Sequence, residues 1–241
     1  VIFYESLKMS ALIVYPQRVP LANGMPTDIV TVPDKDLLES VPVMEASALF
    51  KEIKEHIYKY FDAPDLDIQM FVYYVFFTWF YRKSRVAPIL RFLADLGSGK
   101  SRAVDVIGDL CFYRMKIDGG STAASILRLK QSWHGTATAD EADMKKSQDS
   151  SGYEETMSKF FNLGFEAGKY ITKVSQENMH TQDVFDPFGP KVLGMRAPFR
   201  DQATESRCLS HSPRETNRKD IPNILPPEYF KEAAILRAKL A

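Results

Sequence analysis

Apolar and polar positions divide the chain into an extended start, two helices and a run of alternating strands and helices. Short apolar runs punctuated by prolines predict strands or extended segments over the first part of the chain. From Ala46 the apolar residues fall on one face of a helix, and a break at residues 62–65 precedes a second helix. We expect an extended N-terminal segment (1–45), a helical region packing on a core (46–87) and the core itself (88–241).

The second helix, over Ile68–Tyr81, is very apolar. Its run of about 14 residues is shorter than the ~20 that a membrane span needs, and it is aromatic rather than aliphatic. We therefore expect a buried helix and no membrane partner. An aromatic face turned toward a partner subunit, or stacked on bases, is the alternative. Because no charged segment precedes an apolar one at the start, we expect no signal peptide and a cytoplasmic protein.

The core shows a regular order of strands and helices. Predicted strands cover 89–93, 112–117, 136–139, 169–174 and 191–195, and predicted helices cover 100–111, 122–131 and 152–164. A last helix begins at Pro226-Pro227. This alternation predicts an α/β fold with three layers and a mainly parallel sheet. In such a sheet, the loops at the carboxyl ends of the strands form the ligand crevice.

A glycine-rich turn with a lysine lies between the first core strand and its helix. Residues 94–101 read Ala-Asp-Leu-Gly-Ser-Gly-Lys-Ser, the P-loop pattern with alanine in place of its first glycine. Glycines let the backbone approach phosphate oxygens, and the N–H groups at the helix start bind the anion. The residues expected to bind a nucleotide are Asp95, Leu96, Gly97, Ser98, Gly99, Lys100, Ser101 and Arg102. The alternative is a plain turn with Lys100 in solvent.

An acidic pair, Asp140 and Glu141, follows the third core strand. In P-loop ATPases, the first carboxylate holds Mg²⁺ together with the serine of the loop, and the second polarises the attacking water. We expect Ser101 and Asp140 to be metal ligands, Lys100 to contact the β- and γ-phosphates, and Glu141 to be the catalytic base. ATP and Mg²⁺ are the expected ligands. An acidic loop start at the surface is the alternative.

Arginines follow the strand at 191–195. In ring ATPases, the end of the equivalent strand carries a polar residue that senses the γ-phosphate, and here Met195 and Arg196 stand at that position. A later arginine serves a neighbour's nucleotide, and we expect this catalytic role of Arg207, with Arg200 and Arg214 as lesser candidates. The alternative for each arginine is a surface ion pair.

The composition and charge of the chain limit how it could bind DNA or a metal ion. The chain has 241 residues, 45% hydrophobic and 26% charged, and a formal net charge of zero, so any DNA contact must be a local patch or need an assembled ring. Cys111 and Cys208 cannot form a disulfide framework and are expected to be reduced thiols. The four histidines show no metal-ligand spacing with them, so we expect no zinc site.

Four segments resemble one group of ATPases. The chain resembles archaeal, plasmid and phage replication ATPases of the AAA+/superfamily 3 helicase-like kind in the segments Leu90–Arg102, Asp140–Asp143, Phe188–Lys191 and Glu205–Cys208. Proteins of this group are sometimes fused to primase domains. The similarity covers roughly Phe50 to Ala241. It implies a homo-oligomeric ring that hydrolyses ATP and acts on DNA, in replication of a mobile element, virus or plasmid. Ala94 and the residues at the sensor position depart from that pattern.

Two other classes of nucleotide-binding protein remain as alternatives. A P-loop small-molecule kinase would use the same loop, but a base such as Glu141 would waste ATP there by activating water. A binding module that does not hydrolyse its nucleotide could use the site only to order an assembly, and Ala94 and the weakly apolar strand before Asp140 keep that alternative in view.

Overall fold

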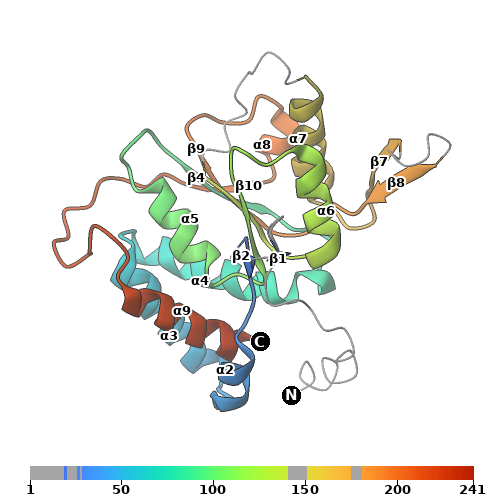
Figure 1. The fold of residues 1–241 in the computed structure, drawn as a ribbon. Coiled ribbons are helices and arrows are strands. Elements are labelled where there is room, and N and C mark those ends of the chain that lie inside the picture. Colours follow the sequence, from blue (N-terminus) through green and yellow to red (C-terminus); the bar gives the residue numbers. More distant parts are fainter. Residues whose placement is uncertain (1–18, 21–25, 28, 141–150, 175–180) are drawn as a thin grey trace.

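The computed structural model describes residues 19–20, 26–27, 29–140, 151–174 and 181–241, and a six-stranded sheet lies at its centre (Figure 1). Five strands are parallel, and only the short edge strand β3 is antiparallel to its neighbour. The order across the sheet is β10 (Cys208–His211), β4 (Ile89–Leu93), β9 (Lys191–Met195), β6 (Ala137–Ala139), β5 (Arg114–Ile117) and β3 (Val30–Thr31).

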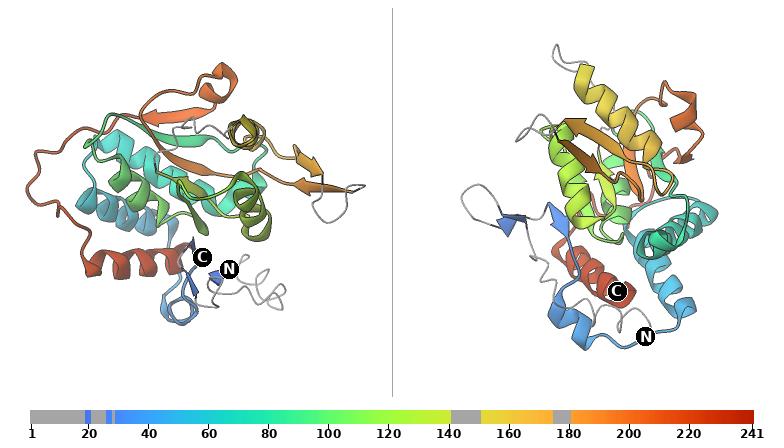
Figure 2. Two further views of the ribbon diagram at one scale, coloured as in Figure 1. Left: turned by 45° about the horizontal axis from the view of Figure 1, so that its top comes forward. Right: turned by 90° about the vertical axis from the view of Figure 1, so that its right-hand side faces the viewer.

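Helices cover both faces of this sheet and complete three layers (Figures 1 and 2). One face packs on α3 (Ala46–Tyr60), α4 (Asp65–Phe80), α5 (Lys100–Gly108) and α9 (Pro227–Leu240). The other face packs on α6 (Ala123–Trp133) and α7 (Ser151–Leu163). These layers confirm the predicted α/β class with a mainly parallel sheet.

The side chains of β4 show why helices pack on both faces of the sheet. Leu90 and Phe92 point into the core shared with α5, whereas Ile89 belongs to the opposite core with α6 and α7. Alternate residues of a strand face opposite sides, so a strand buried on both faces is a nearly continuous apolar run. Arg91 is the polar exception, and its buried guanidinium pairs with Glu205.

The aromatic helix α4 is fastened to the sheet by polar atoms as well as by its rings. The Tyr74 hydroxyl lies 2.9 Å from the carbonyl oxygen of Pro88 and 2.8 Å from that of Lys191, at the amino ends of β4 and β9. Trp79 donates its ring N–H to the carbonyl of Leu110. The helices before the sheet therefore share one hydrophobic core with α5.

Several elements differ from the sequence prediction. The strand expected near 169–174 is β7 (Ile171–Val174), but it pairs antiparallel with β8 (Gln182–Phe185) in a separate hairpin that projects from the body (Figures 1 and 2). The N-terminal segment was expected to be extended, yet it contains helix α2 (Lys35–Ser40), capped by the Asp34 carboxylate.

The smaller elements complete the chain. A short ladder joins the two strands nearest the N-terminus, and a 3₁₀ turn follows α4. They are β1 (Val19–Pro20), β2 (Pro26–Thr27), the 3₁₀ turn Tyr81–Lys83 and α8 (Gln202–Glu205). In the described ranges no helix is both long enough and apolar enough to cross a membrane.

Candidate functional site

The glycine loop, residues 94–99, connects the carboxyl end of β4 to the start of α5. Gly97 has φ +76° and Gly99, the residue that caps α5, has φ +88°. Side chains disfavour this left-handed region by roughly 1–2 kcal/mol per residue, which explains both glycines. A Cβ atom at either position would meet nothing within 4 Å, so open space lies over the loop. Within the described part of the chain, no side chain caps the first turn of α5, and its N–H groups can bind an anion.

Lys100 lies at the first position of α5 and turns back into the loop. Its side chain is buried, and its amine donates to the carbonyl oxygen of Asp95. The hydroxyl of Ser98 donates to the same oxygen at 2.7 Å. Within the described residues, the Lys100 ammonium is therefore held by a neutral oxygen rather than by a carboxylate. Its positive charge remains available to an anion bound in the loop.

Arg114 on β5 locks α5 to the strand that carries the acidic candidate. Its guanidinium donates to Asp105 on α5 and to Asp109, the residue after that helix, each at 2.6 Å, and to the Thr138 hydroxyl on β6 at 3.0 Å. Burial alone would raise the pKa of the Asp109 carboxyl, but the adjacent Arg114 charge outweighs it and the pKa is lowered. This network joins the carboxyl-terminal end of α5 to β5 and to the middle of β6.

Asp140 follows β6 at the same edge of the sheet as the glycine loop. One strand, β9, separates β6 from β4, and its Gly194 is paired with Phe92 next to the loop. A Cβ atom on Gly194 would lie 2.7 Å from an Asp140 carboxylate oxygen and 3.3 Å from a methyl group of Val104 on α5. The exposed Asp140 carboxylate thus lies on the α5 face of the sheet, the face from which Lys100 enters the loop.

The other expected ligands take different positions. Ser101 is exposed in the first turn of α5. The Arg102 side chain points away from the loop, because its guanidinium donates to the carbonyls of Asn223 at 2.6 Å and Tyr60 at 3.5 Å. The second acid, Glu141, lies outside the described residues. Among the residues that are described, no group of three or more His, Cys, Asp and Glu could hold a metal ion.

The predicted sensor position lies between the glycine loop and Asp140. Met195 ends β9 and is buried, and its carbonyl accepts the N–H of Ala94 at the start of the loop. Arg196 comes next and is exposed at this edge. A cation therefore stands at the position where the sequence analysis expected a polar sensor.

Arg207 lies at the other end of the sheet. Its carbonyl pairs with the N–H of Ile89 at the amino end of β4, whereas the glycine loop follows the carboxyl end. Its guanidinium donates to the Ala203 carbonyl at 2.6 Å and lies over the Phe165 ring. The structure does not bring Arg207 to the glycine loop of its own chain, and its role at a neighbour's nucleotide stays a prediction.

The lesser arginine candidates are both exposed. Arg200 lies in the segment between β9 and α8. Arg214 follows β10, whose register with β4 places that strand's last residue, His211, opposite Phe92 at the edge that carries the glycine loop. Both residues therefore follow the carboxyl ends of strands, β9 and β10, at the edge that carries the glycine loop.

Sequence reasoning missed Gly194. It is the residue that makes room for the Asp140 carboxylate beside α5. The available signal was a glycine inside an apolar strand, which often marks a close approach of another group.

Comparisons with known proteins give remote likenesses only. No protein-family profile and no curated protein matches the sequence. Among solved structures, an apo A form of the NrS-1 C-terminal region (residues 305–718) has a TM-score of 0.48 at 16% identity, covering 87% of this chain and 48% of that one. A JCV helicase with a bound thiazolopyridine acetamide compound has a TM-score of 0.43 at 12% identity, covering 81% of this chain and 53% of that one. The chain spans about half the length of these structures.

Proposed function

We propose that this chain binds a nucleoside triphosphate with Mg²⁺ and hydrolyses it, with the glycine loop acting as a P-loop. The single observation that carries the proposal is the placement of the Lys100 ammonium and the Asp140 carboxylate on one face of the sheet, at one edge. One is a cation inside a loop of positive-φ glycines, and the other is an exposed hard-oxygen ligand. Phosphate groups bind to a cation in a loop of this kind, and Mg²⁺ prefers carboxylate oxygens as ligands.

The residues have separable tasks. The loop N–H groups and Lys100 would hold and orient the phosphates, since both carry positive charge toward the open space over Gly97 and Gly99. Ser101 and Asp140 would hold Mg²⁺, which supplies charge neutralisation for the transferring phosphoryl group. Glu141, the residue after Asp140, would accept a proton from the attacking water.

The finer proposal is a helicase-like motor acting on DNA in the replication of a mobile element, virus or plasmid. It is supported by the motif resemblance in the sequence and by a local excess of basic residues, with seven Lys or Arg against four Asp or Glu between positions 191 and 220. The projecting β7–β8 hairpin offers a further surface outside the nucleotide site. A ring assembly and an Arg207 finger belong to this finer proposal.

The test compares ATP turnover and nucleotide binding in four proteins. Glu141→Gln should abolish turnover and keep binding, and Lys100→Ala should lose both. Lys116→Ala, which removes an exposed lysine on β5, is the matched control and should behave as the unmodified chain. Single-stranded DNA should raise turnover. Turnover that needs a small-molecule acceptor would identify a kinase instead, and binding without turnover in the unmodified chain would identify a binding module.

The Arg207 proposal has its own test. In a ring, the Lys100→Ala and Arg207→Ala variants are each inactive, but mixing them creates some interfaces with an intact lysine and an intact neighbouring arginine. We expect the mixture to recover part of the turnover. Arg207→Ala with full activity would remove this residue from the mechanism without affecting the P-loop proposal.

A further inference from the structure

Helix α4 exposes a line of large apolar side chains on the side turned away from the sheet. Leu66 is 76% exposed, Tyr73 63% and Phe80 49%, with Met70 and Phe77 half-buried between them. We call these five residues the α4 seam. The opposite side of the helix fills the core with residues such as Phe71 and Val75. A helix that is apolar around its whole circumference is normally buried on every side, so the exposed parts of these side chains are suited to a further apolar contact.

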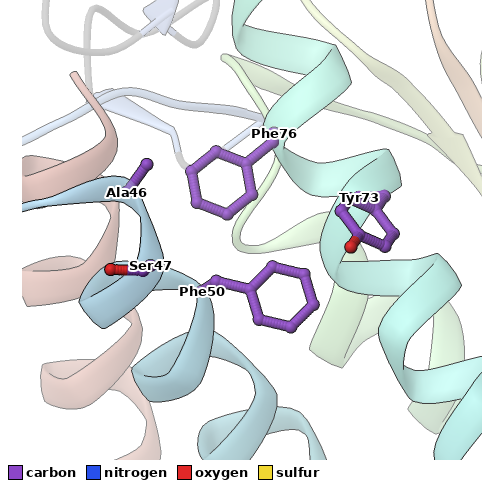
Figure 3. Close-up of a pocket in the computed structure, with 5 residues that line it drawn as sticks. All are labelled: Ala46, Ser47, Phe50, Tyr73 and Phe76. Atoms are coloured by element: carbon purple, nitrogen blue, oxygen red, sulfur yellow. The ribbon is translucent and has the colours of Figure 1, made fainter.

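The spacing of the seam fits another helix. Its members recur at intervals of four, three, four and three residues, the heptad pattern of residues that interlock between paired helices. A groove of about 460 Å³ runs beside it, between α3 and α4 (Figure 3). Figure 3 shows the Phe50 and Phe76 rings and Tyr73 around this groove, with the small residues Ala46 and Ser47 at the start of α3. The groove can receive a side chain from a helix lying on the seam.

We propose that the seam pairs with the same seam of a second copy, with the two α4 helices antiparallel and a two-fold axis at Tyr73. Tyr73 is seven residues from both Leu66 and Phe80, so an antiparallel pair places Tyr73 against Tyr73 and each Leu66 against a Phe80. Leu66 and Met70 of one copy then face Phe80 and Phe77 of the other, so aliphatic side chains pack against aromatic ones on both sides of the central Tyr73 pair. A parallel pair would instead place the large Phe80 rings against each other.

The charges at the ends of α4 favour the same direction. Asp65 begins the helix, and its carboxylate stays 66% exposed although the Lys54 amine lies 2.6 Å away. Arg82 and Lys83 follow the end of the helix and are exposed. Antiparallel pairing brings the acidic start of one α4 to the basic end of the other, whereas parallel pairing brings like charges together. The helix dipoles favour the antiparallel arrangement as well.

This contact is independent of the nucleotide. A two-fold contact uses the same surface on both copies and closes on two chains, whereas a ring requires two different surfaces. The seam also shares no residue with the proposed nucleotide site, so we expect pairing without ATP or DNA, and its failure would not contradict the proposed hydrolysis.

Cysteine cross-linking tests the geometry directly. Under mild oxidation without nucleotide, Tyr73→Cys should form a covalent dimer, because the two residues meet at the axis. Leu66→Cys alone and Phe80→Cys alone should form no covalent dimer, because position 66 faces position 80 of the other copy. A mixture of the two variants should cross-link. The unmodified chain, whose Cys111 is buried and whose Cys208 is half-buried, is the background control. Dimers from Leu66→Cys alone would indicate parallel helices and would overturn the proposal.

Sedimentation of the chain gives a second, non-covalent readout. Tyr73→Glu should weaken self-association at least tenfold, while Ile224→Glu, which charges an 83% exposed apolar residue outside the seam, should leave it unchanged. Lys83→Glu should weaken it, and adding Asp65→Lys to the same chain should recover part of the loss. Circular dichroism checks that each variant is folded. The proposal is overturned if the unmodified chain stays monomeric up to concentrations on the order of 100 μM, where even weak interfaces associate. This result would count against it even if another protein were found to cover the seam.

Discussion

The Asp140 carboxylate fills the space that a side chain at Gly194 would need. A Cβ atom at position 194 would lie 2.7 Å from the Asp140 oxygen, closer than such atoms approach in proteins. The two residues belong to neighbouring strand ends, β9 and β6, and the strand beyond them leads into the glycine loop. The glycine therefore determines where the acid points, and through the acid it governs the proposed metal site.

Gly194→Ala should reduce Mg²⁺-dependent turnover without unfolding the chain. The new methyl group would push the flexible Asp140 side chain aside, because the Val104 methyl on the other side leaves little room. Loss of a residue that orients a metal ligand typically costs roughly 10- to 100-fold in affinity or activity. We expect a higher Mg²⁺ requirement in steady-state ATPase assays. Gly152→Ala, where a Cβ meets nothing within 4 Å, is the control, and equal Mg²⁺ curves for both variants would contradict the role of Gly194.

Gly97→Ala and Gly99→Ala should weaken nucleotide binding although both positions have open space. The cost arises from backbone angles of +76° and +88°, which alanine resists by roughly 1–2 kcal/mol. The loop would relax and turn its N–H groups away from the anion. Equilibrium binding of a fluorescent nucleotide measures the loss, which we expect to be about tenfold for each variant. Gly119→Ala is matched for space but not for φ, and a loss of similar size there would show that φ is not the cause.

The sequence predicted the strands with strong apolar runs to the residue, as β4 and β9 show. The predicted helix over 100–111 is three residues too long, because Leu110 and Cys111 stay fully buried in the turn after α5. The spacing of apolar residues indicates which positions are buried, but it does not distinguish the end of a helix from a buried turn that follows it. Strand β10 was missed because Cys208–His211 has no apolar run and takes its conformation from pairing with β4.

The same distinction applies to the candidate site. Gly97, Gly99 and Lys100 were predictable because their roles are local: a backbone angle and a helix start, both written in consecutive residues. Gly194 was not, since its role depends on the register of three strands that are far apart in the chain. The position of Arg207 also follows from pairing, which places its segment at the amino end of β4.

Glu205→Ala should destabilise the fold by about 3 kcal/mol, the lower end of the cost of breaking a buried ion pair, because the Glu205 side chain is 33% exposed and the Ser210 hydroxyl still accepts from Arg91. Glu205 accepts two 2.5 Å hydrogen bonds from Arg91, which is only 2% exposed in the middle of β4. It also accepts the N–H of Phe199 at 2.9 Å. Urea unfolding measures the loss. Replacing both members with methionine should recover much of the stability, and a double variant as unstable as Glu205→Ala would argue against the pair as the cause.

The stability of the chain should rise with pH between about 7 and 10.5 through Lys130. This side chain is fully buried, and its amine donates to the Gly135 carbonyl at 2.7 Å. Burial lowers the pKa of the Lys130 amine from 10.5 to about 7; the Asp186 charge opposes this shift, and Arg82 adds to it. Between these two values the unfolded chain holds a proton that the folded chain lacks. Folding therefore becomes more favourable as pH rises through this window.

Lys130→Met isolates this contribution. Burial raises the pKa of the Tyr74 and Tyr229 hydroxyls, which act in the opposite direction at high pH but are the same in both proteins. The free energy of urea unfolding of the unmodified chain, minus that of Lys130→Met, should therefore increase steadily from pH 7 to pH 10. Lys116→Met, at an exposed lysine, should give no such trend. Parallel pH curves for the unmodified chain and Lys130→Met would mean that the buried amine keeps its proton. The Gly135 carbonyl and the Tyr81 ring, whose centroid lies 5.4 Å from the amine, would then stabilise the charge well enough to offset burial.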